Sequence, residues 1–203
     1  MNGICYIVGA GEFYSHIDKR NCDLVIAADG GYDATIAHNV PCDLLVGDMD
    51  SISGLPYGVE ILRVPVEKDE TDTYLCYLEG VRRGYTDFVI FGGVGGRDDH
   101  TFANYSLLIG AIKQGHRVTL VGERFNIFAI ANEKFEISGC AGRALSVFAF
   151  SGDAEGVSIS GCKYTAEKIT LSPMFPLGVS NTVTEERASV EVERGVLLLM
   201  LER

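Results

Sequence analysis

Short apolar runs alternate with stretches of helical periodicity from residue 3 to about residue 121. The runs ICYIVGA, DLVIAADGG, CDLLVGD and DFVIFGG hold consecutive hydrophobic residues instead of alternating ones. Such runs are typical of strands covered on both faces, and strands of this kind form parallel sheets flanked by helices. The pattern therefore predicts an α/β domain with three layers, in which a mainly parallel sheet lies between helices.

Two stretches of this part carry apolar residues at helical spacing. The first is TDTYLCYLEGVRRG, residues 71–84, in which Thr71 or Asp72 suits the N-cap and Gly84 suits the C-terminal stop. The second is DDHTFANYSLLIGAIKQGH, residues 98–116, which has the same arrangement of acids at its start and glycine near its end. Each stretch predicts one helix that packs against the sheet.

The second part of the chain has a different pattern. After about residue 130 helical spacing disappears, and the runs RALSVFAFS, GVSISG, RASVEVERG and VLLLMLER are short, β-rich and separated by glycines. This pattern is expected of an antiparallel sandwich or barrel. We therefore predict an α/β domain over residues 1–128 and an all-β sandwich domain over residues 129–203.

Composition and charge narrow the classes of function. Among 203 residues, 47% are hydrophobic and 22% charged, which is usual for a soluble globular protein. The formal net charge is −11, with 28 acids against 17 bases and no stretch rich in lysine or arginine, so a nucleic-acid partner is not expected. No apolar run is long enough to cross a membrane, and the first residues lack the basic region of a signal peptide. We expect a cytoplasmic protein without a membrane partner, and its six dispersed cysteines to be buried, reduced thiols.

Acids and glycines follow several of the predicted strands. Ligands of open parallel sheets bind where the strands end, so these residues are candidates for a site. Asp29 and Gly30 follow one run, Asp48 and Asp50 follow the next, and the segment GGVGGRDDH follows a third. Each feature alone is also compatible with an ordinary turn or helix cap, but their convergence on one edge favours a binding site.

The pair of acids in GDMDS indicates a metal. In an extended chain Asp48 and Asp50 point to the same side, while Met49 points to the core. Two neighbouring carboxylates repel one another unless a cation lies between them. Mg²⁺ prefers one or two carboxylates together with phosphate oxygens, so the pattern predicts Mg²⁺ carrying a nucleotide, with a solvated polar turn as the alternative.

The segment GGVGGR suggests the phosphate ligand. Its glycines, Gly95 and Gly96 among them, allow backbone N–H groups to approach phosphate oxygens, and Arg97 adds a forked cation. Neither a P-loop nor a dinucleotide fingerprint is present. Gly9 and Gly11 are weaker candidates for a wall of the same pocket. Within the following helix His100 and Asn104 lie one turn apart and can face the site, although His100 could equally serve helix packing.

At these residues the chain resembles the thiamine pyrophosphokinase family. AADGG is similar to the family's A-D-G-G element, GDMDS to its G-D-[FL]-D-S signature and KDETDT to its D-x-T-D element. GGVGGRDDHTFAN, GCKY and PLGVSN resemble three further elements. All six occur in the family's order over residues 27–181. Met49 in place of an aromatic residue or leucine and the additional Asp98 are the departures.

The resemblance implies a fold, an activity and residue roles. Family members transfer the pyrophosphoryl group of ATP to thiamine with Mg²⁺, as homodimers whose site lies between the catalytic domain of one subunit and the β-domain of the other. Combined with the residue patterns, it implies four sets of residues: metal ligands Asp48, Asp50 and Asp72; catalytic residues Asp72, Arg97 and Asp99; nucleotide-binding residues Asp29, Gly30, Thr71, Gly95, Gly96, Arg97 and Asn104; and thiamine-binding residues Tyr164, Ser180 and Asn181.

Some alternatives stay open at the level of sequence. Either Asp72 or Asp99 could accept the proton of the attacking alcohol. A pterin pyrophosphokinase would share the acidic edge but needs a different acceptor pocket, against which GCKY and PLGVSN argue. A nucleotide-sensing module without catalysis would tolerate the loss of an acid, whereas every acid is present here.

Overall fold

The computed structural model describes residues 3–54 and 57–203, which form two compact units. The first unit comprises the residues up to 107 together with 115–123, and the second comprises 108–114 together with 124–203. Helix α3 therefore contributes to both. The roles assigned to the two predicted domains are taken up below as part of the proposed function.

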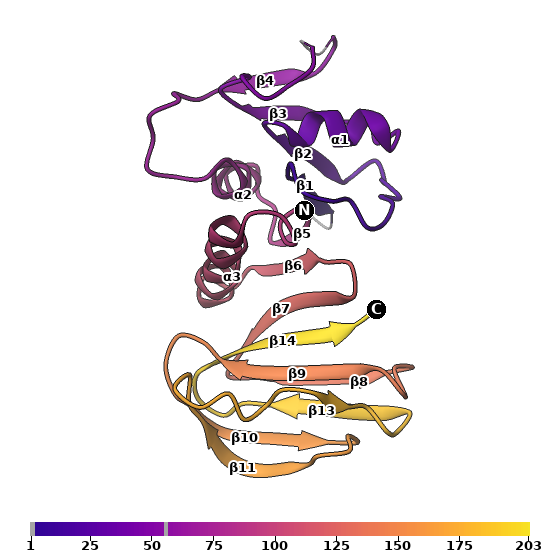
Figure 1. The fold of residues 1–203 in the computed structure, drawn as a ribbon, viewed down its shortest axis with the longest axis vertical. Coiled ribbons are helices and arrows are strands. Elements are labelled where there is room, and N and C mark those ends of the chain that lie inside the picture. The colour runs from indigo at the N-terminus through magenta and orange to yellow at the C-terminus, as the bar shows by residue number, and fades with distance from the viewer. Residues whose placement is uncertain (1–2, 55–56) are drawn as a thin grey trace. The chain divides into compact units, whose positions relative to one another are not determined.

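The first unit is built on a parallel sheet. Within the described residues its strand order is β6-β5-β1-β2-β3-β4, and every neighbouring pair is parallel (Figure 1). This confirms the predicted parallel sheet. The strands are β1 Ile4–Val8, β2 Leu24–Ala28, β3 Leu44–Gly47, β4 Glu60–Arg63, β5 Asp87–Phe91 and β6 Arg117–Val121.

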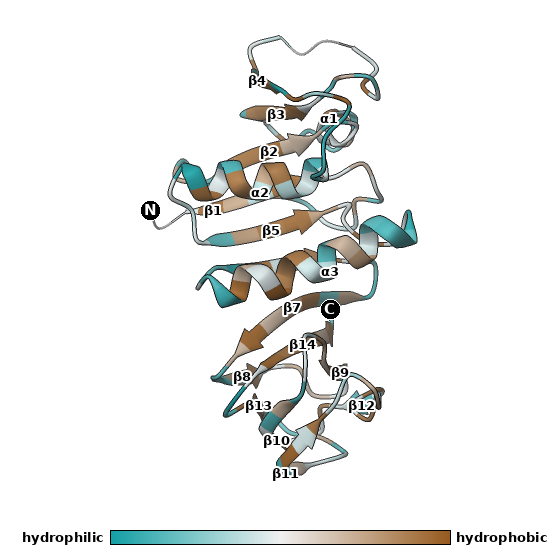
Figure 2. Cartoon of the chain, turned by 90° about the vertical axis from the view of Figure 1, so that its left-hand side faces the viewer, coloured by the Kyte–Doolittle hydropathy of each residue, from teal (hydrophilic) through white to brown (hydrophobic). Residues whose placement is uncertain are grey.

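Helices cover both faces of this sheet, as the sequence predicted. Figure 1 shows α1 (Gly31–Ala37) on one face and α2 (Asp72–Arg82) with the start of α3 (Asp98–Lys113) on the other. The strands β2 and β3 are mostly hydrophobic along their length, whereas α2 and α3 mix both kinds of residue (Figure 2). Burial of the strands between two helical layers explains why their sequences carry unbroken apolar runs.

The predicted ends of α2 have a clear local cause. The Thr71 hydroxyl oxygen accepts a hydrogen bond from the backbone N–H of Tyr74, with an N–O distance of 3.2 Å, so Thr71 is the N-cap. At the other end Gly84 has φ +88°, which a glycine adopts at little cost. The cap fixes Asp72 as the first residue of the helix, next to the carboxyl ends of the strands.

The order of the strands creates a switch point beside β1. From β1 the chain proceeds to β2, β3 and β4 on one side, and β5 and β6 lie on the other. The segments that follow β1 and β5 stay close, since Gly9 N–H donates to Phe91 O at 2.8 Å and Gly11 N–H donates to Gly92 O at 3.1 Å. A crevice outside the carboxyl ends at such a point is the usual ligand site of this architecture.

The second unit is an antiparallel sandwich, which confirms the prediction for this part of the chain. Its two sheets have the orders β12-β9-β14-β7 and β11-β10-β13-β8. Ile130 and Leu197 from the first sheet share one core with Val157 and Val190 from the second. The strands are β7 Phe125–Ala131, β8 Lys134–Ser138, β9 Ala144–Ala149, β10 Ala154–Ser160, β11 Ala166–Leu171, β12 Asn181–Thr182, β13 Arg187–Glu191 and β14 Val196–Glu202.

Two general expectations can be compared with the structure. All six cysteines are free thiols, and burial raises the pKa of the Cys5 thiol to about 12. Only Cys5, Cys76 and Cys162 are buried, so the expectation that all six are buried was wrong for Cys22, which is exposed, and for Cys42 and Cys140, which are half-buried. Among the described residues, no helix has both the length and the apolar character that a membrane crossing requires.

Candidate functional site

A cavity of about 490 Å³ lies at the carboxyl ends of β1, β2, β3 and β5 in the first unit. It occupies the switch point, where the order of the strands reverses. Five segments that are distant in sequence contribute to its wall. The predicted site residues among its lining are Asp29, Gly30, Asp48, Asp50, Asp72, Gly96, Arg97 and Asn104.

Three carboxylates of this cavity converge. Asp29, Asp48 and Asp50 each offer an oxygen, and these oxygens all lie within 4.8 Å of one another. The sequence analysis grouped Asp48 and Asp50 with Asp72; in the structure Asp29 is the third member of the cluster. Asp29 directly follows β2 and the other two directly follow β3, so parallel pairing of these neighbouring strands brings the acids together.

A strained turn shapes the cluster. Met49 has φ +73° and Asp29 has φ +45°, a backbone region that residues other than glycine rarely adopt. The assumption that residues 48–50 are extended was therefore wrong. The turn is held by the Met49 N–H, which donates to Asp29 Oδ1 at 3.2 Å, and by the Asp50 N–H, which donates to Asp48 Oδ1 at 3.1 Å. The Met49 side chain packs against the core, as predicted.

The chemistry of this cluster fits a hard divalent cation. Within residues 3–54 and 57–203, no basic side chain forms an ion pair with Asp29, Asp48 or Asp50. Three negative groups at this separation repel one another strongly without a counter-charge. Oxygen ligands alone suit Mg²⁺ or Ca²⁺ better than a softer metal.

Asp72 lies in the same cavity but has its own partner. Lys68 Nζ is 2.9 Å from Asp72 Oδ1 as an ion pair, and Lys68 lies in the segment before α2. The geometry is not that of a hydrogen bond, so this buried oxygen has no hydrogen-bond partner. Sequence reasoning missed Lys68, because it precedes the first residue of α2 and the spacing rule for helical ion pairs does not apply to it.

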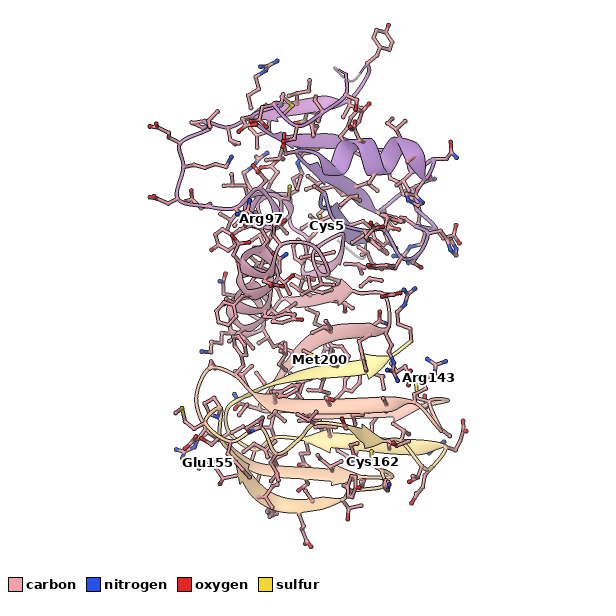
Figure 3. The ribbon with its side chains drawn as sticks, viewed as in Figure 1. Cys5, Arg97, Arg143, Glu155, Cys162 and Met200 are labelled. Carbon is pink, nitrogen blue, oxygen red and sulfur yellow. The ribbon has the colours of Figure 1, made fainter. Side chains whose placement is uncertain are left out.

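The glycine-rich segment and Arg97 form another side of the cavity. Arg97, labelled in Figure 3, immediately precedes α3 and is exposed. Its guanidinium donates to both oxygens of Asp99, with Nη2–Oδ2 at 2.6 Å and Nε–Oδ1 at 3.1 Å. These hydrogen bonds lower the pKa of Asp99 to about 2. Asp99 does not line the cavity itself, but it is hydrogen-bonded to Arg97, which does.

Other predicted residues have structural partners. The buried Asn104 side chain donates through Nδ2 to Gly93 O at 2.7 Å, which fixes the glycine segment to α3. Thr71 uses its hydroxyl as the helix cap. Gly95 lines a neighbouring cavity, while His100 lines the same cavity as Arg97. Some of the predicted nucleotide-binding residues thus line the cavity, and others fix the backbone of the segments around it through hydrogen bonds.

The predicted thiamine-binding residues form a local group in the second unit. The buried Asn181 side chain accepts from Tyr164 N–H at 2.9 Å and donates to Tyr164 O at 2.7 Å. This pair holds the Tyr164 backbone, while the Tyr164 ring is 59% exposed with Lys163 Nζ at 5.2 Å from its centroid. Ser180 has φ +61° and is exposed. The sequence elements GCKY and PLGVSN are therefore neighbours in space.

An acidic, glycine-lined cavity at the switch point of a parallel sheet defines an α/β enzyme that handles phosphate groups. The chain belongs to the thiamin pyrophosphokinase family. Residues 18–120 match the family described as "Thiamin pyrophosphokinase, catalytic domain", and residues 132–197 match "Thiamin pyrophosphokinase, vitamin B1 binding domain".

Individual relatives agree with this family. Thiamine pyrophosphokinase of Bacillus subtilis (strain 168) is 26% identical over 161 residues, which cover 76% of this chain and 75% of that protein. A crystal structure of thiamine pyrophosphokinase from Bacillus subtilis has a TM-score of 0.87 at 22% identity, with 98% of both chains covered. Thiamin pyrophosphokinase from Candida albicans has a TM-score of 0.78 at 15% identity, covering 98% of this chain and 89% of that one. At these identities the likeness to solved structures establishes the shared fold.

Proposed function

We propose that the protein transfers the pyrophosphoryl group of ATP to the hydroxyl group of thiamine, giving thiamine diphosphate and AMP. The observation that carries this proposal is the meeting of three carboxylates and a glycine-rich segment with Arg97 in one cavity. A metal-bound polyphosphate has the charge that such a cavity requires. The match of residues 132–197 to a vitamin B1 binding domain supports thiamine over a pterin as the acceptor.

In this proposal Asp48 and Asp50, with Asp29 beside them, hold Mg²⁺. The ion, when bound, neutralises phosphate charge and orients the triphosphate. Asp29 also positions the loop of the other two acids through its hydrogen bond from Met49 N–H. Asp72 lies at the edge of the same cavity and can join the metal set when its pairing with Lys68 is exchanged.

The glycine segment and Arg97 bind the phosphates in this proposal. Backbone N–H groups of Gly95 and Gly96 and the start of α3 present partial positive charge, and Arg97 offers a full one. Arg97 would exchange Asp99 for phosphate oxygens, because both carboxylate and phosphate accept its forked donors. Asp99 thus holds the guanidinium in place before ATP binds.

The reaction needs an oxygen that accepts the alcohol proton. The hydroxyl oxygen of thiamine attacks the β-phosphorus, the bond from that phosphorus to the oxygen bridging to the α-phosphate breaks, and AMP leaves. Of the two candidates, we favour Asp72, because it lines the cavity and Asp99 does not. In this role Asp72 exchanges its ion pair with Lys68 for the hydroxyl of thiamine. Asp99 is the weaker candidate, since Arg97 lowers its pKa to about 2.

The product pattern tests the proposed function. With purified protein, Mg²⁺, thiamine and ATP labelled at the β-phosphorus, we expect AMP and thiamine diphosphate in equal amounts and the label in thiamine diphosphate. Thiamine monophosphate is not expected at any time, because the pyrophosphoryl group moves as one unit. Formation of ADP and thiamine monophosphate would instead assign the site to ordinary γ-phosphoryl transfer.

We further propose a homodimer in which Tyr164, Ser180 and Asn181 of one subunit serve the site of its partner. The exposed Tyr164 ring suits the cationic thiazolium of thiamine. The six free cysteines are compatible with the reducing cytoplasm, where we place the reaction.

Mixing two inactive variants tests this arrangement. Asp48→Asn removes the metal site of its own chain and Tyr164→Ala removes the aromatic wall. A hybrid dimer of the two variants is expected to regain one intact site, so activity should return after subunit exchange. Exchange is verified with chains of different mass tags. A verified hybrid without activity would show that each site is built within one chain.

A further inference from the structure

Asp72 differs from the other acids of the cavity in having a counter-charge of its own. Four aspartates line this cavity: Asp29, Asp48, Asp50 and Asp72. Across residues 3–54 and 57–203, the ion pair between Asp72 and Lys68 is the only one that involves any of the four. Lys68 is therefore the positive charge that the chain supplies to these acids by direct pairing.

The segment before α2 turns the Lys68 side chain inward. This segment leads from β4 to α2, and it begins beside the carboxyl end of β3, where Val64 N–H donates to Gly47 O at 3.1 Å. The Lys68 side chain is only 14% exposed, although its neighbours Glu67 and Asp69 are both exposed. A charged side chain that is this well covered, in an otherwise exposed segment, needs a reason for its position.

The contact between Lys68 and Asp72 is held weakly from both sides. The N–O distance is 2.9 Å, but the contact lacks hydrogen-bond geometry, and Asp72 Oδ1 is buried without a hydrogen-bond partner. The ammonium carries three N–H donors, and the acceptor it has among the described residues is Pro65 O at the long distance of 3.4 Å. Such a pair costs little to separate when another cation replaces the ammonium.

A second pair of a lysine and an aspartate in this unit shows the contrast. Lys19 Nζ donates to Asp43 Oδ1 at 2.5 Å, and Asp43 Oδ2 accepts from Val25 N–H at 2.8 Å. The Lys19 side chain is 19% exposed, close to the value for Lys68. Asp43 directly precedes β3, at the end of the strand opposite to the cavity. Both of its oxygens have hydrogen bonds, so this pair has the geometry of a structural contact.

We infer that Lys68 is an exchangeable counter-cation, which pairs with Asp72 until a divalent cation binds to the carboxylate cluster. The inference rests on the proposed function, since it requires a cation at Asp29, Asp48 and Asp50. A divalent cation attracts the Asp72 carboxylate and repels the Lys68 ammonium, so the ion pair separates as the metal binds. Lys68 is thus a positioning residue: the Asp72 carboxylate becomes available to the reaction only after the metal has bound.

Metal affinity in the absence of substrates tests this exchange through a double-mutant cycle. Electron paramagnetic resonance of Mn²⁺ measures binding to the wild type, Lys68→Met, Asp72→Asn and the double variant. Methionine retains an apolar stem and removes the charge. Lys68→Met is expected to bind Mn²⁺ roughly fivefold more tightly, because no ion pair has to be displaced. In the Asp72→Asn background the same change should alter the affinity less than about twofold, since the ammonium has no carboxylate that holds it at the site.

Two further variants serve as controls for the cycle. Lys68→Arg keeps a cation that can pair with Asp72 and is expected to bind Mn²⁺ as the wild type does. Lys19→Met removes the comparable charge from the pair with Asp43, which does not line the cavity, and it should leave Mn²⁺ affinity unchanged.

The sign of the change distinguishes the inference from other roles of Lys68. A purely structural role predicts weaker Mn²⁺ binding in Lys68→Met, and a charge that stays in place predicts equal tightening with Asp72 and with asparagine. Either result, or an unchanged affinity, would overturn the inference. A wild type that binds no Mn²⁺ would refute the proposed metal site and the inference with it. Because no substrate is present, a protein that shows the expected cycle but makes no thiamine diphosphate would refute the proposed reaction alone.

Discussion

Asp48→Asn and Asp50→Asn are each expected to lower kcat/KM by about 10²–10³-fold or more. Each change keeps the shape of the side chain but removes one negative charge from the cluster whose oxygens lie within 4.8 Å. The remaining carboxylates hold a divalent cation less firmly, and phosphate charge is then less well neutralised. A high concentration of Mg²⁺ should restore part of the lost activity, because it raises the fraction of sites that hold the ion despite the weaker binding.

Activity against Mg²⁺ concentration, together with Mn²⁺ binding followed by magnetic resonance, checks this prediction. Asp87→Asn is the matched control, since Asp87 is an exposed aspartate at the amino end of β5, away from the carboxyl ends of the strands where the cavity lies. It should leave both activity and metal affinity unchanged. If Asp48→Asn and Asp50→Asn were fully active in the presence of EDTA, the cluster could not be a metal site.

Gly92→Ala is expected to lower the free energy of unfolding by about 3 kcal/mol. A Cβ at this position would lie 2.5 Å from Gly9 O and 2.9 Å from Gly11 O, and the residue has φ +64°. Because the obstacle is backbone, the segments after β1 and β5 would have to separate. Their hydrogen bond from Gly11 N–H to Gly92 O, at 3.1 Å, would be lost as well.

Urea denaturation followed by circular dichroism measures this loss. Gly84→Ala separates the two causes, because Gly84 also has a positive φ, at +88°, but no heavy atom lies within 4 Å of its Cβ position. Only backbone strain applies there, so about 1 kcal/mol is expected. Equal losses in the two variants would show that the close approach at the switch point contributes nothing to stability.

Most of the fold could be predicted because buried positions require apolar residues, which form recognisable patterns in the sequence. The unbroken apolar runs of β2 and β3 reflect strands covered on both faces, and the glycines at 84 and 115 mark the ends of α2 and α3. By contrast, β4 (EILR) was missed because an exposed edge strand needs no long apolar run, and its two apolar residues stand between charged ones. The seven residues of α1 are too few to show helical periodicity.

The candidate site was predictable in part for a related reason. The sequence by itself determined which residues follow the strands: Asp29, Asp48 and Asp50 come directly after the ends of β2 and β3, and parallel strands end at one edge. Only the tertiary structure decided that Asp29 is the third member of the carboxylate cluster. The positive φ of Met49 turns its N–H toward Asp29, whereas Asp72 forms an ion pair with Lys68. The rings of Phe13 and His38 likewise stack only in the folded chain. Contacts between residues distant in sequence depend on tertiary packing, and no periodic sequence pattern predicts them.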